Sequence, residues 1–431
     1  MSVFAKASAS RSVRAVITGV AMVGVSALLL TGCSSNSAAP TASEKPAASG
    51  DAKAIKAGDR NLTLKIGTIL PQSGALAFLG PPEEAGVALA VKDINDAKLG
   101  LTIDPVYRDS GDTTTDTATV SVTDLLSQDV SAIIGAASSG VSKTVIDQIT
   151  GAGVVQFSPA NTSADFTKYD DKGLYWRTAP SDLLQGEVLG NQIAEDGNST
   201  LGLIVLNDSY GTGLSDSTTK AFEAAGGKVV AKSLFNEGDS NFAAQISEVT
   251  AAKPDAIALI TFDQAKVITP ALVGSGYPGG KLYFVDGNLS DYSKDFAPGL
   301  ITGAKGTLPG LDVGTLGDFT TRLKEIDPTL TDYSYAAESY DAVVLIALAA
   351  YAANDVKGTS IADYLRQVSG GTGDGTKVTD FKTAAKALAK GEQVNYDGFS
   401  GPVTFDENGD PTEATIGVYE YKADNTYKRI N

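Results

Sequence analysis

Histidine is absent from this sequence. Its absence removes the usual general base, the serine and cysteine catalytic triads and the histidine-ligated zinc sites from consideration. Cysteine occurs once, at Cys33, so neither an intramolecular disulfide nor a site with several thiolate ligands is available. No Walker motif or Gly-x-Gly-x-x-Gly loop follows the first expected strand, which argues against a nucleotide site. We therefore expect no cofactor, no bound metal and no catalytic residues.

Positive charge is also scarce. The chain has 34 Lys and Arg residues against 51 Asp and Glu residues, for a net charge of −17. A surface of this charge repels phosphate groups, which argues against nucleic acid and anionic lipid headgroups as partners. Hydrophobic residues make up 42% and charged residues 20% of the chain, a balance typical of globular domains, and 431 residues leave room for two or three of them.

The N-terminal segment explains the position of the single cysteine. Three basic residues precede an apolar run over residues 15–30, which is short for a membrane-spanning helix. This order predicts a signal peptide over residues 1–32. Its end, Leu30-Thr31-Gly32-Cys33, resembles the lipobox of bacterial lipoproteins, in which a peptidase cuts before the cysteine and the thiol carries a diacylglycerol. We expect lipid attachment at Cys33; the alternative is a cytosolic protein with a buried cysteine behind an apolar helix.

Residues 33–60 are predicted to form a flexible linker. They contain few large apolar side chains, so they bury too little surface to offset the loss of chain entropy on ordering. The preceding leader carries basic but no acidic residues, so the cleaved chain is more acidic than the whole. Because an acidic chain has no affinity for an anionic membrane surface, anchoring on the extracytoplasmic face of the cell membrane is expected to depend on the lipid.

From Asn61 onward, short β-rich runs alternate with helical patterns, which is typical of parallel sheets covered by helices. Strands are predicted over residues 62–66, 131–134, 154–157, 201–206, 255–261 and 281–285. Helices are predicted over residues 81–97, 116–127, 141–150, 183–195, 214–225, 242–252 and 264–275. The most apolar internal segment, 342–353, is too short to span a membrane and is predicted to be a core helix. The order of elements is similar on either side of Thr178, so we predict an α/β fold of two similar lobes.

The segments that directly follow the predicted strands are the places to look for a ligand site, because open α/β sheets bind ligands at the carboxyl ends of their strands. These segments are residues 71–74, 136–140, 158–162, 207–211, 262–264 and 286–288. Small hydroxyl residues and glycines dominate the first three segments and offer donors suited to a carboxylate. Acidic and aromatic residues dominate the last three.

Each candidate residue in these segments also has a purely structural interpretation. Ser139 and Thr162 are residue types that commonly cap helices at strand-to-helix turns. Tyr210 and Phe262 are compatible with ordinary core aromatics, and Asp286 with a turn residue. The functional interpretation depends on the conjunction of these residues.

Several segments together resemble the type I periplasmic binding proteins of ABC transporters, and among them the receptors for leucine, isoleucine and valine. The resemblance covers residues 64 to about 421 and depends on the order and spacing of its segments. The segments are Ile66-Gly67-Thr68 through Ser73-Gly74, Ile133-Ile134-Gly135 through Ser139, Ser158-Pro159-Ala160-Asn161-Thr162, Arg177-Thr178-Ala179-Pro180-Ser181-Asp182 with Gln185-Gly186, Asp208-Ser209-Tyr210-Gly211, and Gly401-Pro402-Val403-Thr404-Phe405-Asp406 with Gly409-Asp410.

The resemblance implies two Rossmann-like lobes joined by a hinge that the chain crosses three times. The crossings are expected near residues 178–181, 303–309 and 399–402. Lobe one would then comprise residues 61–179 plus 308–398, and lobe two residues 180–307 plus 399–431. Ligand bound between such lobes shifts an open population toward a closed one.

The resemblance also implies which residues hold the polar ends of a ligand. The carboxylate contacts of the family match Ser139 and Thr162. Its ammonium contacts match Asp286, the carbonyl of Ala160 and the hydroxyl of Thr162. A zwitterion needs donors at one end and a fixed negative charge at the other, so this assignment agrees with the chemistry of the segments.

Three further positions concern closure and the ligand side chain. Tyr210 matches a tyrosine of the second lobe that closes over the ligand. Phe262 occupies a position where several amino acid binders have tyrosine, and Leu79 falls near another position often held by tyrosine. These departures leave the identity of the ligand side chain open.

We interpret the chain as the substrate-binding lipoprotein of an ABC importer that binds a branched-chain or other amino acid and presents it to the permease subunits. Alternatives on the same fold are a binder of amides, urea or small aromatic or aliphatic acids, and a surface sensor without a transporter. An α/β enzyme using Asp or Lys chemistry is the remaining class, and the lack of a histidine, metal cluster or cofactor loop argues against it.

Overall fold

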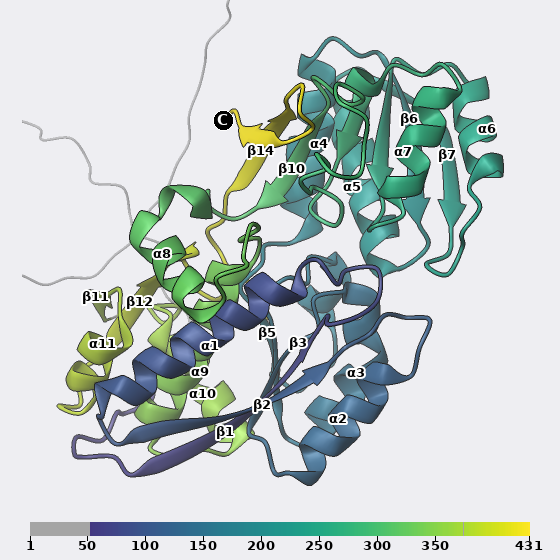
Figure 1. The fold of residues 1–431 in the computed structure, drawn as a ribbon. Helices are drawn as coiled ribbons and strands as arrows, with labels where there is room; N and C mark the ends of the chain where they lie inside the picture. Colours follow the sequence, from purple (N-terminus) through teal and green to yellow (C-terminus); the bar gives the residue numbers. More distant parts are fainter. Residues whose placement is uncertain (1–51, 374) are drawn as a thin grey trace, which may run out of the picture. The chain divides into compact units, whose positions relative to one another are not determined.

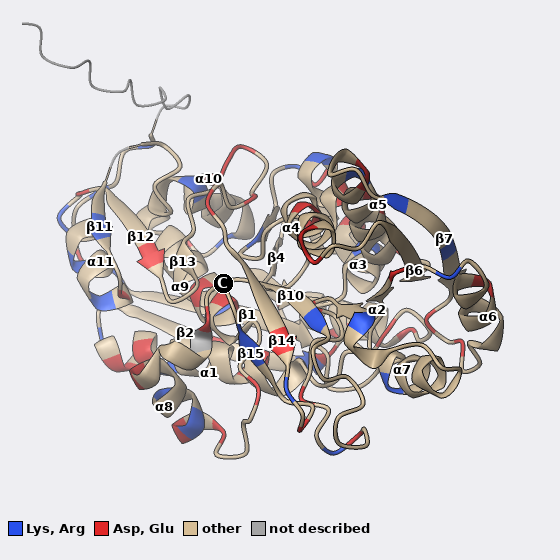
Figure 2. Ribbon diagram, turned by 90° about the horizontal axis from the view of Figure 1, so that it is seen from above, with Lys and Arg blue, Asp and Glu red and all other residues tan. Residues whose placement is uncertain are grey.

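The computed structural model describes residues 52–373 and 375–431 (Figure 1). The predicted signal peptide over residues 1–32 and the predicted lipid attachment at Cys33 lie outside these residues. The described chain is built around two main sheets, and Figure 1 shows each of them flanked by helices. Acidic and basic residues are scattered over the outer helices and loops (Figure 2).

The first sheet has five parallel strands in the order β2-β1-β3-β4-β5. Its strands are β1 (Leu62–Leu70), β2 (Leu101–Asp109), β3 (Ala132–Gly135), β4 (Val155–Ser158) and β5 (Tyr175–Arg177). Alternate side chains of each strand point to opposite faces. Ile134 thus shares a core with α1 (Gly80–Ala97) and α9 (Ala336–Ala353), whereas its neighbour Ile133 packs with α2 (Thr117–Ser127) and α3 (Ser139–Gly151).

The second sheet has seven strands in the order β15-β14-β10-β9-β8-β6-β7. The strands are β6 (Thr200–Leu206), β7 (Lys228–Phe235), β8 (Ala256–Ile260), β9 (Leu282–Phe284), β10 (Lys305–Pro309), β14 (Ile416–Tyr421) and β15 (Tyr427–Arg429). Pairing is parallel from β7 to β10 and antiparallel from β10 through β14 to β15. The helices α4 (Asp182–Glu195), α5 (Ser209–Ala224), α6 (Ala243–Ala251) and α7 (Ala265–Gly274) bury their apolar faces in the core of this sheet.

All but one of the remaining elements belong to the side of the first sheet. The remaining elements are α8 (Gly317–Ile326), α10 (Gly358–Val368), α11 (Phe381–Leu388), β11 (Thr376–Val378), β12 (Val394–Gly398), β13 (Gly401–Pro402) and three short 3-10 helices over residues 164–168, 279–281 and 313–315; of these the 3-10 helix over residues 279–281 alone precedes β9 of the second sheet. Residues of α10, α11 and β12 join the core of α1 and α9. One parallel and one mostly parallel sheet, each flanked by helices, confirm the predicted α/β fold.

Short polar side chains fix where the helices at the edge of the sheets begin. Ser138, Ser181 and Asp208 each accept a hydrogen bond from a backbone N–H in the first turn of α3, α4 and α5. Such caps satisfy donors that the helix itself leaves free. Each of these helices starts shortly after a strand or a crossing of the chain. The caps therefore also fix the conformation of the loops that form the site.

Helix α9 is apolar on all sides. Among the described residues it is the one helix long and apolar enough to cross a membrane, but 94% of this stretch is buried within the protein. A helix that is hydrophobic all round must be covered all round, and α1 and α10 pack against it. The segment 342–353 is therefore part of a core helix, as predicted, and this helix starts six residues earlier, at Ala336.

The chain passes between the two sheets three times, which agrees with the architecture implied by the resemblance. It leaves the first sheet after β5, returns after β10 and enters the second sheet again at β14. Residues Val403 and Phe405 still pack in the first core, so we propose that the third crossing falls within residues 406–415 rather than near residues 399–402.

Residues 53–60 differ from the flexible linker expected over 33–60. The backbone of Lys53 exchanges two hydrogen bonds of 2.9 Å with the Gln367 side chain, and Arg60 is 6% exposed, with Nε donating to the Tyr351 carbonyl at 2.8 Å. The composition of this segment did not predict its order, because residues far along the chain, Gln367 and Tyr351, supply the contacts that hold it. The folded part therefore begins no later than Lys53.

Candidate ligand-binding site

A network of buried hydrogen bonds shapes the loop after β4. The Ser158 hydroxyl donates to the Ala136 carbonyl at 2.7 Å and accepts from the Asn161 N–H at 2.9 Å. The Asn161 amide in turn donates to the carbonyls of Ala136 and Ala137, at 3.0 and 2.8 Å. These bonds tie the loops after β3 and β4 to each other, so that Ala160 faces the same cavity as Ala137.

The two candidate carboxylate contacts are not helix caps. Ser138 caps α3, and Ser163 caps the short helix over residues 164–168, so neither Ser139 nor Thr162 takes that role. Ser139 is 3% exposed and its hydroxyl accepts the Ser163 N–H at 3.3 Å, while Thr162 is 1% exposed. The structural interpretation as caps is therefore wrong for both residues.

The second sheet contributes the aromatic and acidic side of the site. Tyr210 lies in the first turn of α5, and its ring stacks on Phe262 with centroids 5.4 Å apart and an interplanar angle of 18°. Phe262 follows β8, and Asp286 follows β9. Both aromatic rings are nearly fully buried, at 3% and 2% exposure, and both line the cavity.

Asp286 is the focus of a dense set of hydrogen bonds. Its Oδ1 accepts from the Tyr210 hydroxyl at 2.7 Å and from the Gln185 amide at 2.9 Å. Its Oδ2 accepts from the Tyr335 hydroxyl at 2.8 Å. Burial raises the pKa of Asp286, while the hydrogen bonds from Tyr210, Gln185 and Tyr335 lower it. A buried carboxylate held in this way is arranged to receive a further donor or a cation.

Tyr335 reaches Asp286 from the first lobe. It precedes α9 and has a left-handed backbone, with φ of 59°. A non-glycine residue in this region costs on the order of 1 to 3 kcal/mol, so the surrounding contacts must enforce the conformation. The Tyr335 hydroxyl thus donates a hydrogen bond from the first lobe to Asp286 of the second lobe, the residue that the resemblance implies as an ammonium contact.

A second buried carboxyl, Asp182, lies next to this group. Burial raises its pKa well above the usual value, the charge of Asp286 raises it further, and the Thr162 hydroxyl and Arg177 lower it. Neither Asp182 oxygen makes a hydrogen bond of good geometry with another described residue. Within the described chain no group of three or more His, Cys, Asp or Glu side chains is arranged to hold a metal ion. The acids therefore suit an organic cation or a neutral donor.

All of the ligand-binding residues expected from the sequence line a single small cavity. The cavity is formed by Leu79, Ser139, Ala160, Thr162, Tyr210, Phe262 and Asp286, together with Leu76, Ala137, Ser138, Gly287 and Tyr335. Its volume is about 10 Å³, which is roughly the space that one water molecule needs. An amino acid cannot enter without movement of the lobes or of Tyr335.

Contacts at the lip of the cleft keep the lobes together. The backbone N–H of Thr113 donates to Glu237 Oε2 at 3.1 Å, and the Thr113 hydroxyl bonds the same oxygen. Ser163 donates to the Ser209 carbonyl at 3.0 Å. Each bond joins the first sheet's side to the second, so the structure represents a closed conformation.

Two polar residues of the site were missed by the analysis of the sequence. Gln185 stands in a segment that carried the resemblance, yet no role was assigned to it. Tyr335 had no local signal at all, because the residues around it follow no strand of either predicted sheet.

Comparison with known proteins places this geometry in context. A family model described as periplasmic binding protein matches residues 63–426. The Leu/Ile/Val-binding protein homolog 1 of Brucella suis biovar 1 (strain 1330) is 27% identical over 85% of this chain and 92% of its own. The chemotactic signal transduction system substrate-binding protein BasB of Halobacterium salinarum is 26% identical over 78% of this chain and 82% of its own.

Solved structures share the fold. The substrate binding protein LivJ of a branched-chain amino acid transporter from Streptococcus pneumoniae, in complex with isoleucine, superposes with a TM-score of 0.69 at 23% identity and covers 85% of this chain and 99% of its own. An ABC transporter solute binding protein from R. palustris, in complex with benzoate, superposes with a TM-score of 0.67 at 21% identity. The match covers 86% of this chain and 96% of that protein.

Proposed function

Since this chain belongs to the periplasmic binding protein family, we propose that it captures an amino acid, with a branched-chain one as first choice, in the Asp286 cavity and delivers it to an ABC permease. The observation that carries the proposal is the pairing of chemistries in one cavity. Hydroxyl and backbone donors of the first lobe face a buried carboxylate of the second. A zwitterion has the complementary charges at its two ends.

The proposed roles follow from this pairing. Ser139 and Thr162 bind the ligand carboxylate, and Asp286 with the Ala160 carbonyl and the Thr162 hydroxyl binds the ammonium. Tyr210 closes over the ligand from the second lobe. Leu79 and Phe262 then face the ligand side chain, and both are apolar, which supports an aliphatic one.

We further propose that the protein is a lipoprotein on the extracytoplasmic face of the cell membrane. The sequence before Cys33 supports this location, and an acidic chain of net charge −17 has no electrostatic means of holding an anionic surface. The family itself supports an extracytoplasmic binding protein rather than an enzyme.

Two alternatives follow from the relatives. One solved neighbour holds benzoate, which supports a small aromatic or aliphatic acid as ligand on this fold. The relative from Halobacterium salinarum serves in chemotactic signal transduction, which supports a sensor in place of a transporter component. The first alternative predicts a ligand without an ammonium, and therefore differs from our proposal at Asp286.

Asp286→Asn tests the proposal because it keeps the shape of the side chain and removes its charge. For an α-amino acid we expect binding to weaken by about 2 to 5 kcal/mol, as when one partner of a buried charge pair is removed. Calorimetry on protein freed of copurified ligand would compare leucine with its deaminated analogue and a short amide. The exposed Asp295→Asn is the matched control.

The alternatives give a different pattern. If the true ligand is a carboxylic acid or an amide, the asparagine variant binds it as well as or better than the wild type. Unchanged leucine affinity in Asp286→Asn contradicts the proposed ammonium site and leaves the family assignment intact.

A further inference from the structure

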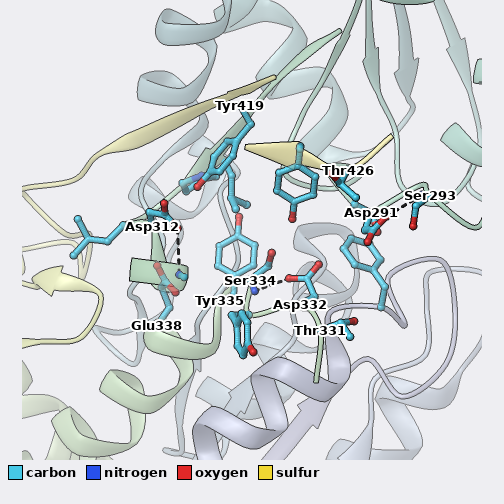
Figure 3. A pocket seen from close by; sticks show the side chains of 18 of the residues that line it. Asp291, Ser293, Asp312, Thr331, Asp332, Ser334, Tyr335, Glu338, Tyr419 and Thr426 are labelled. Atoms are coloured by element: carbon cyan, nitrogen blue, oxygen red, sulfur yellow. Dashed lines mark hydrogen bonds between the residues drawn. The ribbon is translucent and has the colours of Figure 1, made fainter. Parts of the chain in front are cut away.

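A second and much larger cavity lies on the other side of Tyr335. Its volume is about 450 Å³, within the range of small-molecule sites. Asp312, Tyr335 and Glu338 line it from the first lobe, and Tyr419 and Thr426 from the second (Figure 3). Tyr335 is the one described residue that lines both cavities.

The lining of the large cavity is acidic. Four carboxylates face it against the single ammonium of Lys294; they are Asp291, Asp312, Asp332 and Glu338. Three of them accept a backbone N–H two residues further along the chain, at 2.8, 3.1 and 2.8 Å. No ion pair joins any of the four to a basic residue of the described chain. The cavity is therefore lined by acidic groups that no basic residue of the described chain pairs with; among them Asp291 is exposed and Asp312 is half-buried.

Glu338 stands out among these acids. It is 3% exposed, yet its carboxylate makes no hydrogen bond or ion pair to any other residue that the structure describes. It belongs to the first turn of α9 and points into the cavity (Figure 3). Gly310 approaches it so closely that a Cβ there would lie 2.4 Å from Glu338 Oε1. Its oxygens are therefore available to a donor that enters the cavity, and a hydrogen bond from a charged donor is stronger than one from a neutral donor.

Glu83, on α1, is a second buried acid that interacts with Glu338. Both oxygens of Glu83 are buried without a hydrogen-bond partner among the described residues. Burial raises the pKa of Glu83 well above its usual value, and the charge of Glu338 raises it further. Burial therefore favours the protonated form of both carboxyls.

Aromatic rings supply the second recognition element. Tyr333, Tyr335, Tyr419 and Tyr427 all line the cavity, and Tyr419 meets Tyr427 edge to face at 5.5 Å and 85°. The face of a tyrosine ring attracts a positive charge, and rings with nearby carboxylates form the usual surroundings of organic ammonium groups. Metal ions are a poor fit, because no described cluster of His, Cys, Asp or Glu could hold one.

We propose that this cavity is a second binding site, for an organic cation with an ammonium head placed at Glu338 and an apolar body against the tyrosines. It is distinct from the Asp286 cavity and does not require that the ligand proposed there be correct. The chemical class is a primary or quaternary amine of modest size.

The proposal implies that binding releases a proton. Burial raises the pKa of Glu338 to about 8, with its own backbone N–H lowering it and Asp341 raising it. The other groups that interact with it are Glu83 and the hydroxyls of Tyr335 and Tyr419. Near neutral pH Glu338 is therefore mostly protonated, and an ammonium beside it favours the ionised form.

Calorimetry with benzylammonium chloride tests the site, with benzyl alcohol as the neutral isostere. We expect the wild type to bind the cation and not the alcohol, and to release close to one proton, read from the heats in two buffers of different ionisation enthalpy. Glu338→Gln should weaken binding at least about tenfold and abolish the proton release. The exposed Glu325→Gln is the matched control and should leave both unchanged.

The outcomes separate the two cavities. Ser139→Ala acts on the first cavity, so it should leave benzylammonium binding at the wild-type value. Equal affinity for benzylammonium and benzyl alcohol, wild-type affinity in a folded Glu338→Gln, or no measurable binding of benzylammonium or tetramethylammonium would each overturn the proposal. Leucine binding to the same samples reports on the first site separately.

Discussion

Glu338 should make the stability of this protein depend on pH. Burial raises its pKa from the ordinary value of 4.5 to about 8. An acid whose pKa is higher in the folded state binds more protons when folded, so stability falls as pH rises between the two values. Each pH unit in this window contributes about 1.4 kcal/mol. Glu338 alone should therefore remove about 3 kcal/mol of stability between about pH 5 and about pH 8.

Glu338→Gln removes this titration while keeping the size and polarity of the side chain. We expect the substitution to increase the free energy of unfolding relative to the wild type, and to do so more at high pH. The increase at about pH 8 should exceed the increase at about pH 5 by about 3 kcal/mol. Urea unfolding at the two pH values measures the difference, with the exposed Glu325→Gln as the control that should show none. If Glu338→Gln increases the free energy of unfolding equally at both pH values, the prediction is wrong. The effect of the substitution would then not come from removing a buried group that ionises.

Other predictions concern the anchor and the first cavity. Cys33→Ser should release the protein from membranes or leave it uncleaved, which fractionation and intact-mass measurement would detect; a processed, membrane-bound variant contradicts lipid attachment. Ser139→Ala and Thr162→Ala should each weaken ligand binding by roughly tenfold or more, because a desolvated carboxylate loses a donor. Wild-type affinity in the double variant would remove both residues from the site. Tyr335→Phe should favour the open lobes without ligand, seen as a larger radius of gyration in solution scattering; an unchanged radius contradicts a stabilising role for its bond to Asp286.

Much of the fold could be predicted because its signals are local. Helix α7 was expected over residues 264–275 and spans Ala265–Gly274, since its apolar periodicity and flanking turns lie within the segment itself. Strand β2 was missed because it is an edge strand containing Pro105, which disrupts the β pattern but is tolerated where one edge is free. Strand β14 was missed because it pairs with β10, which lies far away in the chain, and β15 was missed because it pairs with β14.

In the site, too, the residues with local signals could be predicted and those positioned by distant segments could not. Ser139, Thr162, Tyr210 and Asp286 could be singled out because each follows a recognisable strand, and parallel strands bring their carboxyl ends to one edge. Tyr335 reaches the cavity from the other lobe, at the start of α9, and its left-handed backbone is imposed by packing. No pattern within the neighbouring residues encodes such a contact. The burial of Glu338 could not be predicted from the sequence either, because it depends on the close approach of Gly310 and on the second lobe.

Mass spectrometry of the small molecules released from the purified protein by denaturation tests the central claim most directly. We expect an α-amino acid in a stoichiometric amount, with the mass of leucine, isoleucine or valine. An aromatic or aliphatic acid without an amine, or an amide, released in the same amount would contradict it.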